Sequence, residues 1–186
     1  MVKPKILAIA GSLRKDSYNK QLALAAKEAV GVRAEFELLD FADVPLFNED
    51  IEFPAPLSVK RVREQVKAAD AIWFFSPEYN HFFSGVLKNL IDWLSRDTEE
   101  DSDLLSGKPT AISGASLGMG GTVTAQDHLV TLISFLDMDV MNYPRLTIPR
   151  VSKQADGNGI LKLTDSAPFL QEQADMFLAF IERRLK

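Results

Sequence analysis

The sequence predicts an α/β fold in which a five-stranded parallel sheet is covered by helices on both faces, a three-layer sandwich. Short apolar runs alternate with segments of helical periodicity along the whole chain, and turns rich in glycine or proline separate them. This alternation is typical of parallel strands joined by right-handed crossovers. At 186 residues the commonest such topology is a doubly wound sheet of order 2-1-3-4-5, so we expect residues 1–186 to form a single domain.

Each expected element has a local signal. Continuous apolar runs, the pattern of strands buried on both faces, predict strands at 6–10 and 71–75. Further strands are expected at 34–39 and 110–114, and a fifth within 140–148. Apolar residues at helical spacing predict helices at 19–30, 59–69, 85–95, from the 118–121 turn to 136, and at 170–185. Gly31 ends the first helix, and Ser84 is placed to cap the third. Residues 40–56 contain three prolines and are expected to form a long loop.

Two helices differ in their apolar surface. The second has one apolar stripe, and its basic residues are expected on the outside: Lys60, Arg61, Arg63 and Lys67. The third is apolar around much of its circumference, which indicates burial on more than one side, either in the core or against another subunit. We expect a homodimer at least, with this helix and its Trp93 near the interface.

The bulk composition excludes several classes of protein. The net charge is −5 and basic residues are scattered, so no nucleic-acid-binding face is expected. The chain has no cysteine and only two histidines, His81 and His128, which argues against a disulfide scaffold and a zinc site. No apolar run approaches a membrane span, and the amino terminus does not resemble a signal peptide. A cytoplasmic protein is therefore expected.

Three turns follow predicted strands at the edge of the sheet where such folds bind ligands. In the first turn, 11–19, free N–H groups and the positive end of the helix dipole favour an anion. Neutral donors beside one cation suit a phosphate monoester, although an ordinary capped turn has the same composition. The candidate residues are Gly11, Ser12, Leu13, Arg14, Ser17, Tyr18 and Asn19.

The second and third turns have the composition of a site for a planar ligand. Aromatic, amide and histidine side chains crowd the second turn, where they could contact a flat ring or form a hydrophobic cover. Small residues in the third would let a ligand approach the backbone, or would make a flexible loop. The candidates are Pro77, Glu78, Tyr79, Asn80 and His81 in the second turn, and Ser113, Gly114, Ala115 and Gly118 in the third.

Other phosphate-binding motifs are excluded by residue identity. The nucleotide-hydrolase loop needs Gly-Lys followed by Ser or Thr, whereas Gly107-Lys108 is followed by Pro109. A cysteine-based phosphatase needs a cysteine, and the dinucleotide fingerprint is absent after the first strand.

Together these motifs resemble the NADPH-dependent FMN reductases, which include quinone, azo-dye and chromate reductases. Residues 11–14 with Ser17 and Asn19 are similar to the family's FMN phosphate loop. Residues 77–80, followed by 85–89 and 91–93, are similar to its second signature, and 113–121 to its third. The resemblance covers nearly the whole chain and implies a flavodoxin-like fold.

The resemblance also implies roles. Ser12, Arg14, Ser17 and Asn19 would hold the FMN phosphate, residues 77–80 would contact the ribityl chain and isoalloxazine ring, and the glycine-rich turn from Ser113 would close the ring's other edge. FMN carries the chemistry in such enzymes, so no catalytic side chain or metal is expected. NADPH or NADH would be the electron donor, and a quinone or another small molecule, such as an azo compound, chromate or free flavin, the acceptor.

Three residues depart from the family pattern. Phe82 stands where a small residue is frequent, which could narrow the pocket. Val130 and Arg145 stand where an arginine and an acidic residue are common, which puts a homotetramer in doubt. The alternative function is that of flavodoxin proper, an electron-transfer protein without its own substrate, but Arg14 and the long second loop argue against it. A signalling receiver domain of the same topology is excluded, because this chain lacks the acidic residues that such a domain requires at the ends of its first and third strands.

Overall fold

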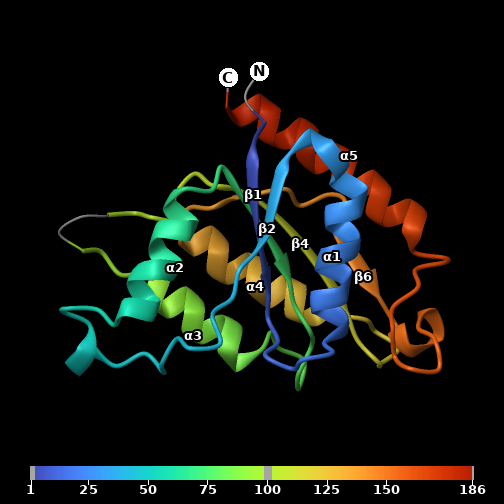
Figure 1. The fold of residues 1–186 in the computed structure, drawn as a ribbon, viewed down its shortest axis with the longest axis horizontal. Helices are drawn as coiled ribbons and strands as arrows, with labels where there is room; N and C mark the ends of the chain where they lie inside the picture. Colours follow the sequence, from blue (N-terminus) through green and yellow to red (C-terminus); the bar gives the residue numbers. More distant parts are fainter. Residues whose placement is uncertain (1–2, 99–101, 186) are drawn as a thin grey trace.

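The computed structural model describes residues 3–98 and 102–185 and confirms a parallel sheet between two layers of helices (Figure 1). The strands are β1 Lys5–Ala10, β2 Glu35–Leu38, β3 Ala71–Phe75, β4 Pro109–Ala115, β5 Asp139–Val140 and β6 Leu146–Ile148. Their order is β2-β1-β3-β4-β5, as expected from the sequence. The fifth strand, however, is divided: β5 pairs with the start of β4 and β6 with its end, because Met141 to Arg145 leave the sheet between them.

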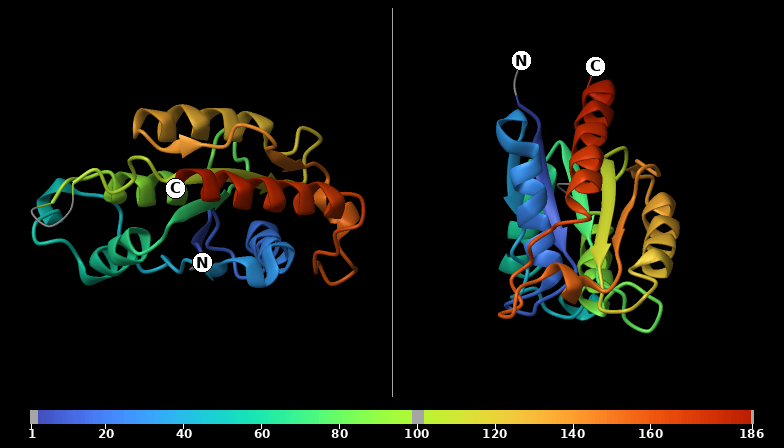
Figure 2. Two further views of the ribbon diagram at one scale, coloured as in Figure 1. Left: turned by 90° about the horizontal axis from the view of Figure 1, so that it is seen from above. Right: turned by 90° about the vertical axis from the view of Figure 1, so that its right-hand side faces the viewer.

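Among the described residues, five α-helices cover the sheet: α1 Tyr18–Val30, α2 Leu57–Lys67, α3 Gly85–Leu94, α4 Val123–Phe135 and α5 Ala167–Arg184. Helices α1 and α5 pack on one face, whereas α2, α3 and α4 pack on the other. Both views of Figure 2 show α1 and α4 on opposite sides of the sheet. No described helix is long and apolar enough to cross a membrane.

The central strand β3 shows how the sheet supplies both cores. All five of its residues are buried, with Trp73 and Phe75 facing α1 and α5, and Ile72 and Phe74 facing the other helices. This alternation follows from the period of two in a strand. It explains why the sequence shows a continuous apolar run instead of alternating polar residues.

The sequence pattern predicts Arg63 on the outside of α2, but the structure buries this residue, which is only 4% exposed. Its Nη1 donates to the carbonyl oxygens of Trp93, at 3.1 Å, and Arg96, at 2.7 Å. These carbonyls lie at the C-terminal end of α3, where the last C=O groups of a helix lack internal partners and a cation is favoured. Arg63 therefore caps a neighbouring helix instead of facing solvent.

The apolar circumference of α3 is covered by the chain itself. The 40–56 loop packs along the helix, with the ring of Phe47 edge-on to Trp93 at 4.9 Å between centroids. Trp93 Nε1 and Asn89 Nδ2 both donate to the Pro45 carbonyl, at 2.9 and 2.8 Å, and the N–H of Phe47 donates to Asn89 Oδ1. Trp93 is thus buried within one chain, so the reason for placing this helix at a subunit interface no longer holds.

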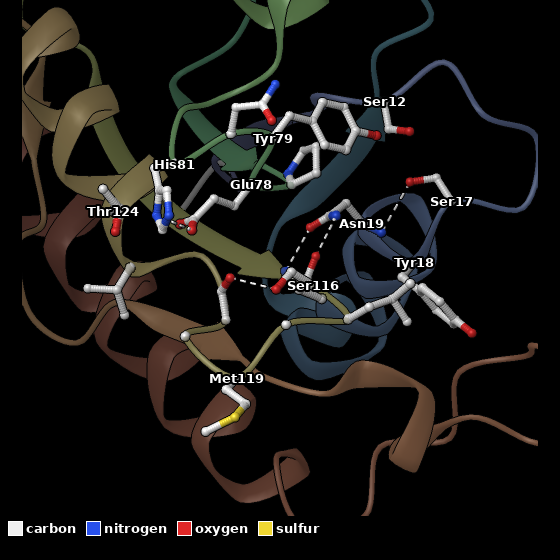
Figure 3. A pocket seen from close by; sticks show the side chains of 18 of the residues that line it. Ser12, Ser17, Tyr18, Asn19, Glu78, Tyr79, His81, Ser116, Met119 and Thr124 are labelled. Carbon is white, nitrogen blue, oxygen red and sulfur yellow. Dashed lines mark hydrogen bonds and ion pairs between the residues drawn. The ribbon is translucent and has the colours of Figure 1, made fainter.

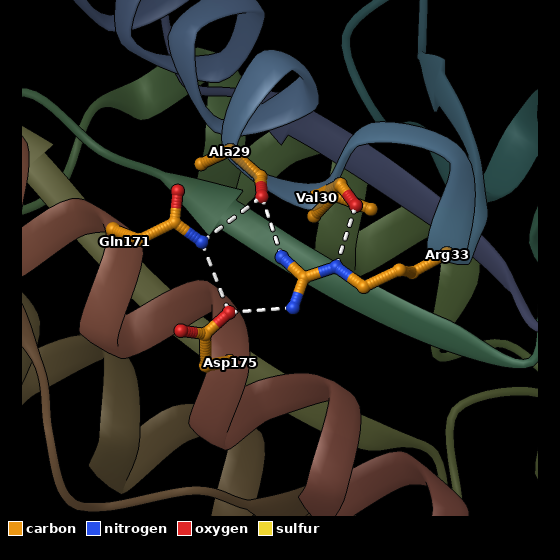
Figure 4. A network of polar contacts seen from close by, with 5 residues as sticks. All are labelled: Ala29, Val30, Arg33, Gln171 and Asp175. Atoms are coloured by element: carbon orange, nitrogen blue, oxygen red, sulfur yellow. Dashed lines mark hydrogen bonds and ion pairs between the residues drawn. The ribbon is translucent and has the colours of Figure 1, made fainter.

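A polar network joins the C-terminal end of α1 to α5 (Figure 4). The Arg33 guanidinium donates to the carbonyls of Ala29 and Val30 and forms an ion pair with Asp175, at 2.6 Å. Gln171 donates to both Ala29 and Asp175. The hydrogen bond from Arg33 is the main cause of a lowered pKa of the Asp175 carboxyl.

Candidate functional site

A cavity of about 1050 Å³ lies beyond the carboxyl ends of β1, β3 and β4, where the three turns singled out in the sequence meet (Figure 3). This is the edge at which open α/β sheets bind ligands. The lining residues are Ser12, Arg14, Ser17, Tyr18, Asn19, Pro77, Glu78, Tyr79, Asn80, His81, Ala115, Ser116, Leu117, Gly118, Met119, Gly120, Gly121, Val123 and Thr124.

The first wall is the loop from β1 to α1. Ser17 is the N-cap, and its Oγ accepts the N–H groups of Asn19 and Lys20 at 3.2 and 3.4 Å. Other N–H groups of this loop have no hydrogen-bond partner among the described residues: those of Leu13, Lys15, Asp16 and Tyr18. Unpaired N–H groups at a helix N-terminus form an anion-binding site. The guanidinium of exposed Arg14, 5.5 Å from the centre of the Tyr18 ring, adds a cation.

Asn19 has a second partner that the sequence did not indicate. Its carboxamide accepts the N–H of Ala115 at 2.9 Å and donates to the Ala115 carbonyl at 3.0 Å. Both residues are buried. This paired contact joins the first turn of α1 to the end of β4, 96 residues away, and so holds the first and third loops together.

The second wall is a tight hairpin. Tyr79 and Phe82 exchange two backbone hydrogen bonds, at 2.9 and 3.0 Å, across the two-residue turn Asn80-His81. Both turn residues have positive φ, at 52° and 62°, as a type I′ turn requires. Because Asn and His adopt this region at a steric cost, the hairpin stores local strain beside the cavity.

Glu78 fastens this hairpin to α4. One carboxylate oxygen accepts the N–H of Ala125 at 2.9 Å, and the other lies 3.5 Å from His81 Nδ1. The contact caps the first turn of α4, whose own cap residue Thr122 makes no side-chain capping bond. Phe82 adds a second link, since its ring stacks on His128 of α4 at 4.5 Å between centroids. The hairpin is therefore held against α4 at both ends.

The third wall, 116–121, depends on close backbone approach. Ser116 Oγ donates to the Gly121 carbonyl at 2.6 Å and closes the loop. A side chain at Gly114, before the loop, would collide with the carbonyl of Ser76 and the hydroxyl of Thr122. Gly121 has φ of 62° and packs directly against Thr147. Glycine is required at both positions, though only the second lines the cavity.

The structure brings twelve of the sixteen candidate residues to the cavity and leaves four outside its lining. Gly11 and Leu13 belong to the first loop without lining the cavity. Ser113 and Gly114 lie within β4, which continues to Ala115. The Ser113 hydroxyl accepts from Trp73 Nε1 and donates to Gln173 Oε1, entirely inside the core.

Several lining residues were not among the candidates. Ser116, Leu117, Met119, Gly120 and Gly121 belong to the glycine-rich turn already recognised, but Val123 and Thr124 were missed. They occupy the first turn of α4. The sequence did contain a signal for these two residues, because a helix that follows a parallel strand begins at the edge of the sheet where that strand ends.

FMN fits this donor set, since it combines a phosphate monoester with a polyhydroxyl chain and a flat ring. The free N–H groups, the Ser12 and Ser17 hydroxyls and Arg14 match the phosphate. The Tyr79 side chain and the backbone of 116–121 offer apolar surface and close approach to a ring. The described residues contain no group of His, Cys, Asp or Glu that could hold a metal ion.

Comparison with known proteins identifies the family of this chain. Residues 4–153 match the family described as NADPH-dependent FMN reductase. The chain is 44% identical to an NAD(P)H-dependent FMN reductase of Pseudomonas aeruginosa, covering 98% of this chain and 97% of that protein. It is 36% identical to a 2-hydroxy-1,4-benzoquinone reductase of a Burkholderia species, covering 97% of each.

A solved structure shows the same fold. FerB, a flavoenzyme NAD(P)H:(acceptor) oxidoreductase from Paracoccus denitrificans, superimposes with a TM-score of 0.87 at 32% identity, covering 97% of this chain and 98% of that one. The sheet order, the three-loop cavity and these matches lead to one assignment. The chain belongs to the NADPH-dependent FMN reductase family, and it is a flavodoxin-like oxidoreductase that uses FMN and a nicotinamide nucleotide.

Proposed function

We propose that this protein is an NAD(P)H:quinone reductase that binds one FMN in the three-loop cavity. The observation that carries the proposal is the first loop, where unpaired N–H groups, two serine hydroxyls and Arg14 converge at the N-terminus of α1. Quinone reductases among its relatives, including the 2-hydroxy-1,4-benzoquinone reductase, support a quinone as acceptor. Azo compounds, chromate and free flavin are further acceptors that we propose on the family resemblance.

When bound, FMN supplies the redox chemistry, taking a hydride from the nicotinamide and passing electrons to the acceptor. The protein's own residues hold the cofactor in position. Ser12, Ser17 and Arg14 anchor the phosphate, and the Asn19–Ala115 pair fixes the distance between the first and third loops. Glu78 holds the hairpin against α4, so that Tyr79 and His81 keep a fixed place beside the ring.

The cavity architecture supports a ping-pong mechanism. All three loops close around one cavity, and besides the FMN phosphate loop the sequence contains no second nucleotide-binding fingerprint. We therefore propose that NADPH and the quinone occupy the same position in turn. Double-reciprocal plots at several quinone concentrations are expected to give parallel lines, with excess quinone competitive against NADPH. Intersecting lines, with a ternary complex seen by equilibrium binding, would contradict this mechanism.

A cytoplasmic location and assembly into at least a homodimer are part of the same proposal. One observation supports the assembly: Phe82 of the hairpin is 43% exposed and stacks on His128 of α4, so apolar ring surface is exposed where these two elements meet. Exposed apolar surface favours contact with another protein. Sedimentation at micromolar concentration is expected to show a species of at least twice 20.7 kDa, and a purely monomeric species would contradict the proposal.

A further inference from the structure

An apolar rim lies along the third wall of the cavity. Leu117, Met119 and Val123 all line the cavity, and we call these three side chains the apolar rim. Leu117 is 67% exposed and Met119 is 75% exposed. A single exposed apolar side chain is ordinary, but several that line one cavity are typical of a surface that binds an apolar ligand.

The rim side chains are exposed on a loop whose backbone is anchored. The Ser116 N–H donates to the carbonyl of Ile148 in β6, at 3.0 Å, and the Gly118 carbonyl accepts the N–H of Arg150, at 2.9 Å. Leu117 stands between these two anchored residues. The rim is therefore preformed, and a ligand that binds it does not have to order the backbone first.

The surroundings of the rim carry no charge in the sequence. Residues 114–124 contain no lysine, arginine, aspartate or glutamate. The phosphate donors belong to the first loop, and Figure 3 shows Met119 well apart from Ser12 and Ser17. An oxyanion such as chromate finds no counter-charge in this loop, whereas a saturated carbon chain gains free energy by leaving water there. Among small electron acceptors, the rim therefore favours an apolar one.

The side-chain types of the rim suit a flexible chain in solution. Met119 has three rotatable bonds and a polarisable sulfur, so it adapts to apolar groups of irregular shape. Leu117 and Val123 add branched apolar surface in the same cavity. Residues 114–124 also lack the basic side chains that attract a protein to an anionic membrane surface. These features favour a dissolved molecule with a short alkyl chain.

We propose that the apolar rim binds an alkyl substituent of the quinone acceptor, so that the enzyme selects dissolved alkylated quinones over quinones without such a chain. The inference rests on the function proposed above and names its substrate more closely. The substituent does not react, so its contact with the rim is the same before and during electron transfer. Such uniform binding lowers KM for the quinone and leaves kcat unchanged.

The test compares kcat/KM for 2-pentyl- and 2-methyl-1,4-benzoquinone in the FMN-loaded enzyme, in buffer without lipid. Both rings carry one saturated carbon, so chain length is the variable. Full burial of a methylene is worth about fourfold, and a rim that covers one side of the chain is expected to give about twofold for each added methylene. The wild type is therefore expected to prefer the pentyl compound by roughly fifteenfold, through KM.

In Leu117→Ser and in Met119→Ser this preference is expected to fall to about fourfold or less, because part of the apolar contact is lost. Both side chains are exposed, so either variant is expected to fold. Leu57→Ser is the matched control, with an unchanged preference. It makes the same substitution at a leucine that is 84% exposed, at the start of α2 and outside the lining of the cavity.

Calorimetry gives a readout independent of turnover, because the oxidised enzyme cannot reduce a quinone without a nucleotide. The pentyl compound is expected to bind the FMN-loaded wild type roughly fifteenfold more tightly than the methyl compound, and each rim variant should lose most of this difference. FMN titration of the FMN-free proteins is expected to give equal affinities for the wild type and the rim variants.

A wild type that reduces both quinones with equal kcat/KM would overturn this inference and leave the proposed function intact. The same holds if the rim variants keep the full preference but bind FMN more weakly, which would assign the rim to the flavin, or keep it but sediment as smaller species, which would assign the rim to a subunit interface. A wild type that binds FMN but reduces no quinone would overturn the proposed function, and this inference with it.

Discussion

The contact between Asn19 and Ala115 allows a quantitative prediction for Asn19→Ala. The substitution removes the hydrogen-bond partners of the buried N–H and C=O groups of Ala115. In the wild type the Asn19 carboxamide bonds them at 2.9 and 3.0 Å. A buried polar group left unpaired costs about 1–3 kcal/mol. Two such groups predict a loss of about 2–6 kcal/mol in the free energy of unfolding, a large share of the roughly 5–15 kcal/mol typical of folded proteins.

The assay is urea unfolding of the FMN-free protein, because bound FMN would add its own stabilisation. Asn142→Ala is the control, since exposed Asn142 makes no side-chain hydrogen bond with a described residue. At neutral pH the free energy of unfolding of Asn19→Asp is expected to lie between the values of the wild type and Asn19→Ala, or below both. A carboxylate still accepts the Ala115 N–H, but it repels the Ala115 carbonyl. FMN affinity should fall in both Asn19 variants, since the first and third loops are no longer joined.

The reasoning would be refuted by an Asn19→Ala protein whose unfolding free energy equals that of the wild type. That result would mean that water replaces the carboxamide at no cost, and that the two loops hold their positions by other contacts. A loss of FMN affinity without any loss of stability would instead return Asn19 to the role that the sequence alone suggested, a direct phosphate ligand.

Two further predictions concern charged residues. Arg14→Ala is expected to weaken FMN binding by about 1–3 kcal/mol while leaving unfolding of the FMN-free protein unchanged, because the side chain is exposed; equal FMN affinity by equilibrium titration would show that Arg14 is only a solvated charge. Arg33→Gln is expected to lower stability by about 0.5–1.5 kcal/mol at neutral pH, reduced by solvent screening of an exposed pair. Because the folded-state pKa of Asp175 is lowered, its contribution is present above the unfolded value of about 3.9 and is lost as pH falls through the folded value. Urea unfolding between neutral and acid pH should therefore show the wild type and the variant converging, and a constant difference would contradict the assignment to the Arg33–Asp175 pair.

Much of the fold could be predicted because the sequence carries it locally. The continuous apolar run of β3 and the single stripe of α1 each identify their element without any other part of the chain. The order of the strands follows from the handedness of crossovers. The division into β5 and β6 could not be predicted, since it depends on which parts of β4 remain unpaired at the sheet edge.

The site was predictable at the level of loops and less so at the level of single atoms. Arg14 and Ser17 lie where their motif placed them. Ser113 lies inside β4, and strand alternation places it on the same face as Ala111 and Ala115, where its hydroxyl meets Gln173 of α5. The burial of Arg63 and the pairing of Asn19 depend on partners 30 or more residues away, which no local pattern contains.

The central claim is that the first loop binds the phosphate of FMN. The most direct measurement is an equilibrium titration of the FMN-free protein with FMN and with riboflavin, followed by the quenching of flavin fluorescence. We predict one FMN per chain, with riboflavin bound more weakly by about tenfold or more, because it lacks the group that pairs with Arg14 and the free N–H groups. Equal affinity for the two flavins would contradict the account.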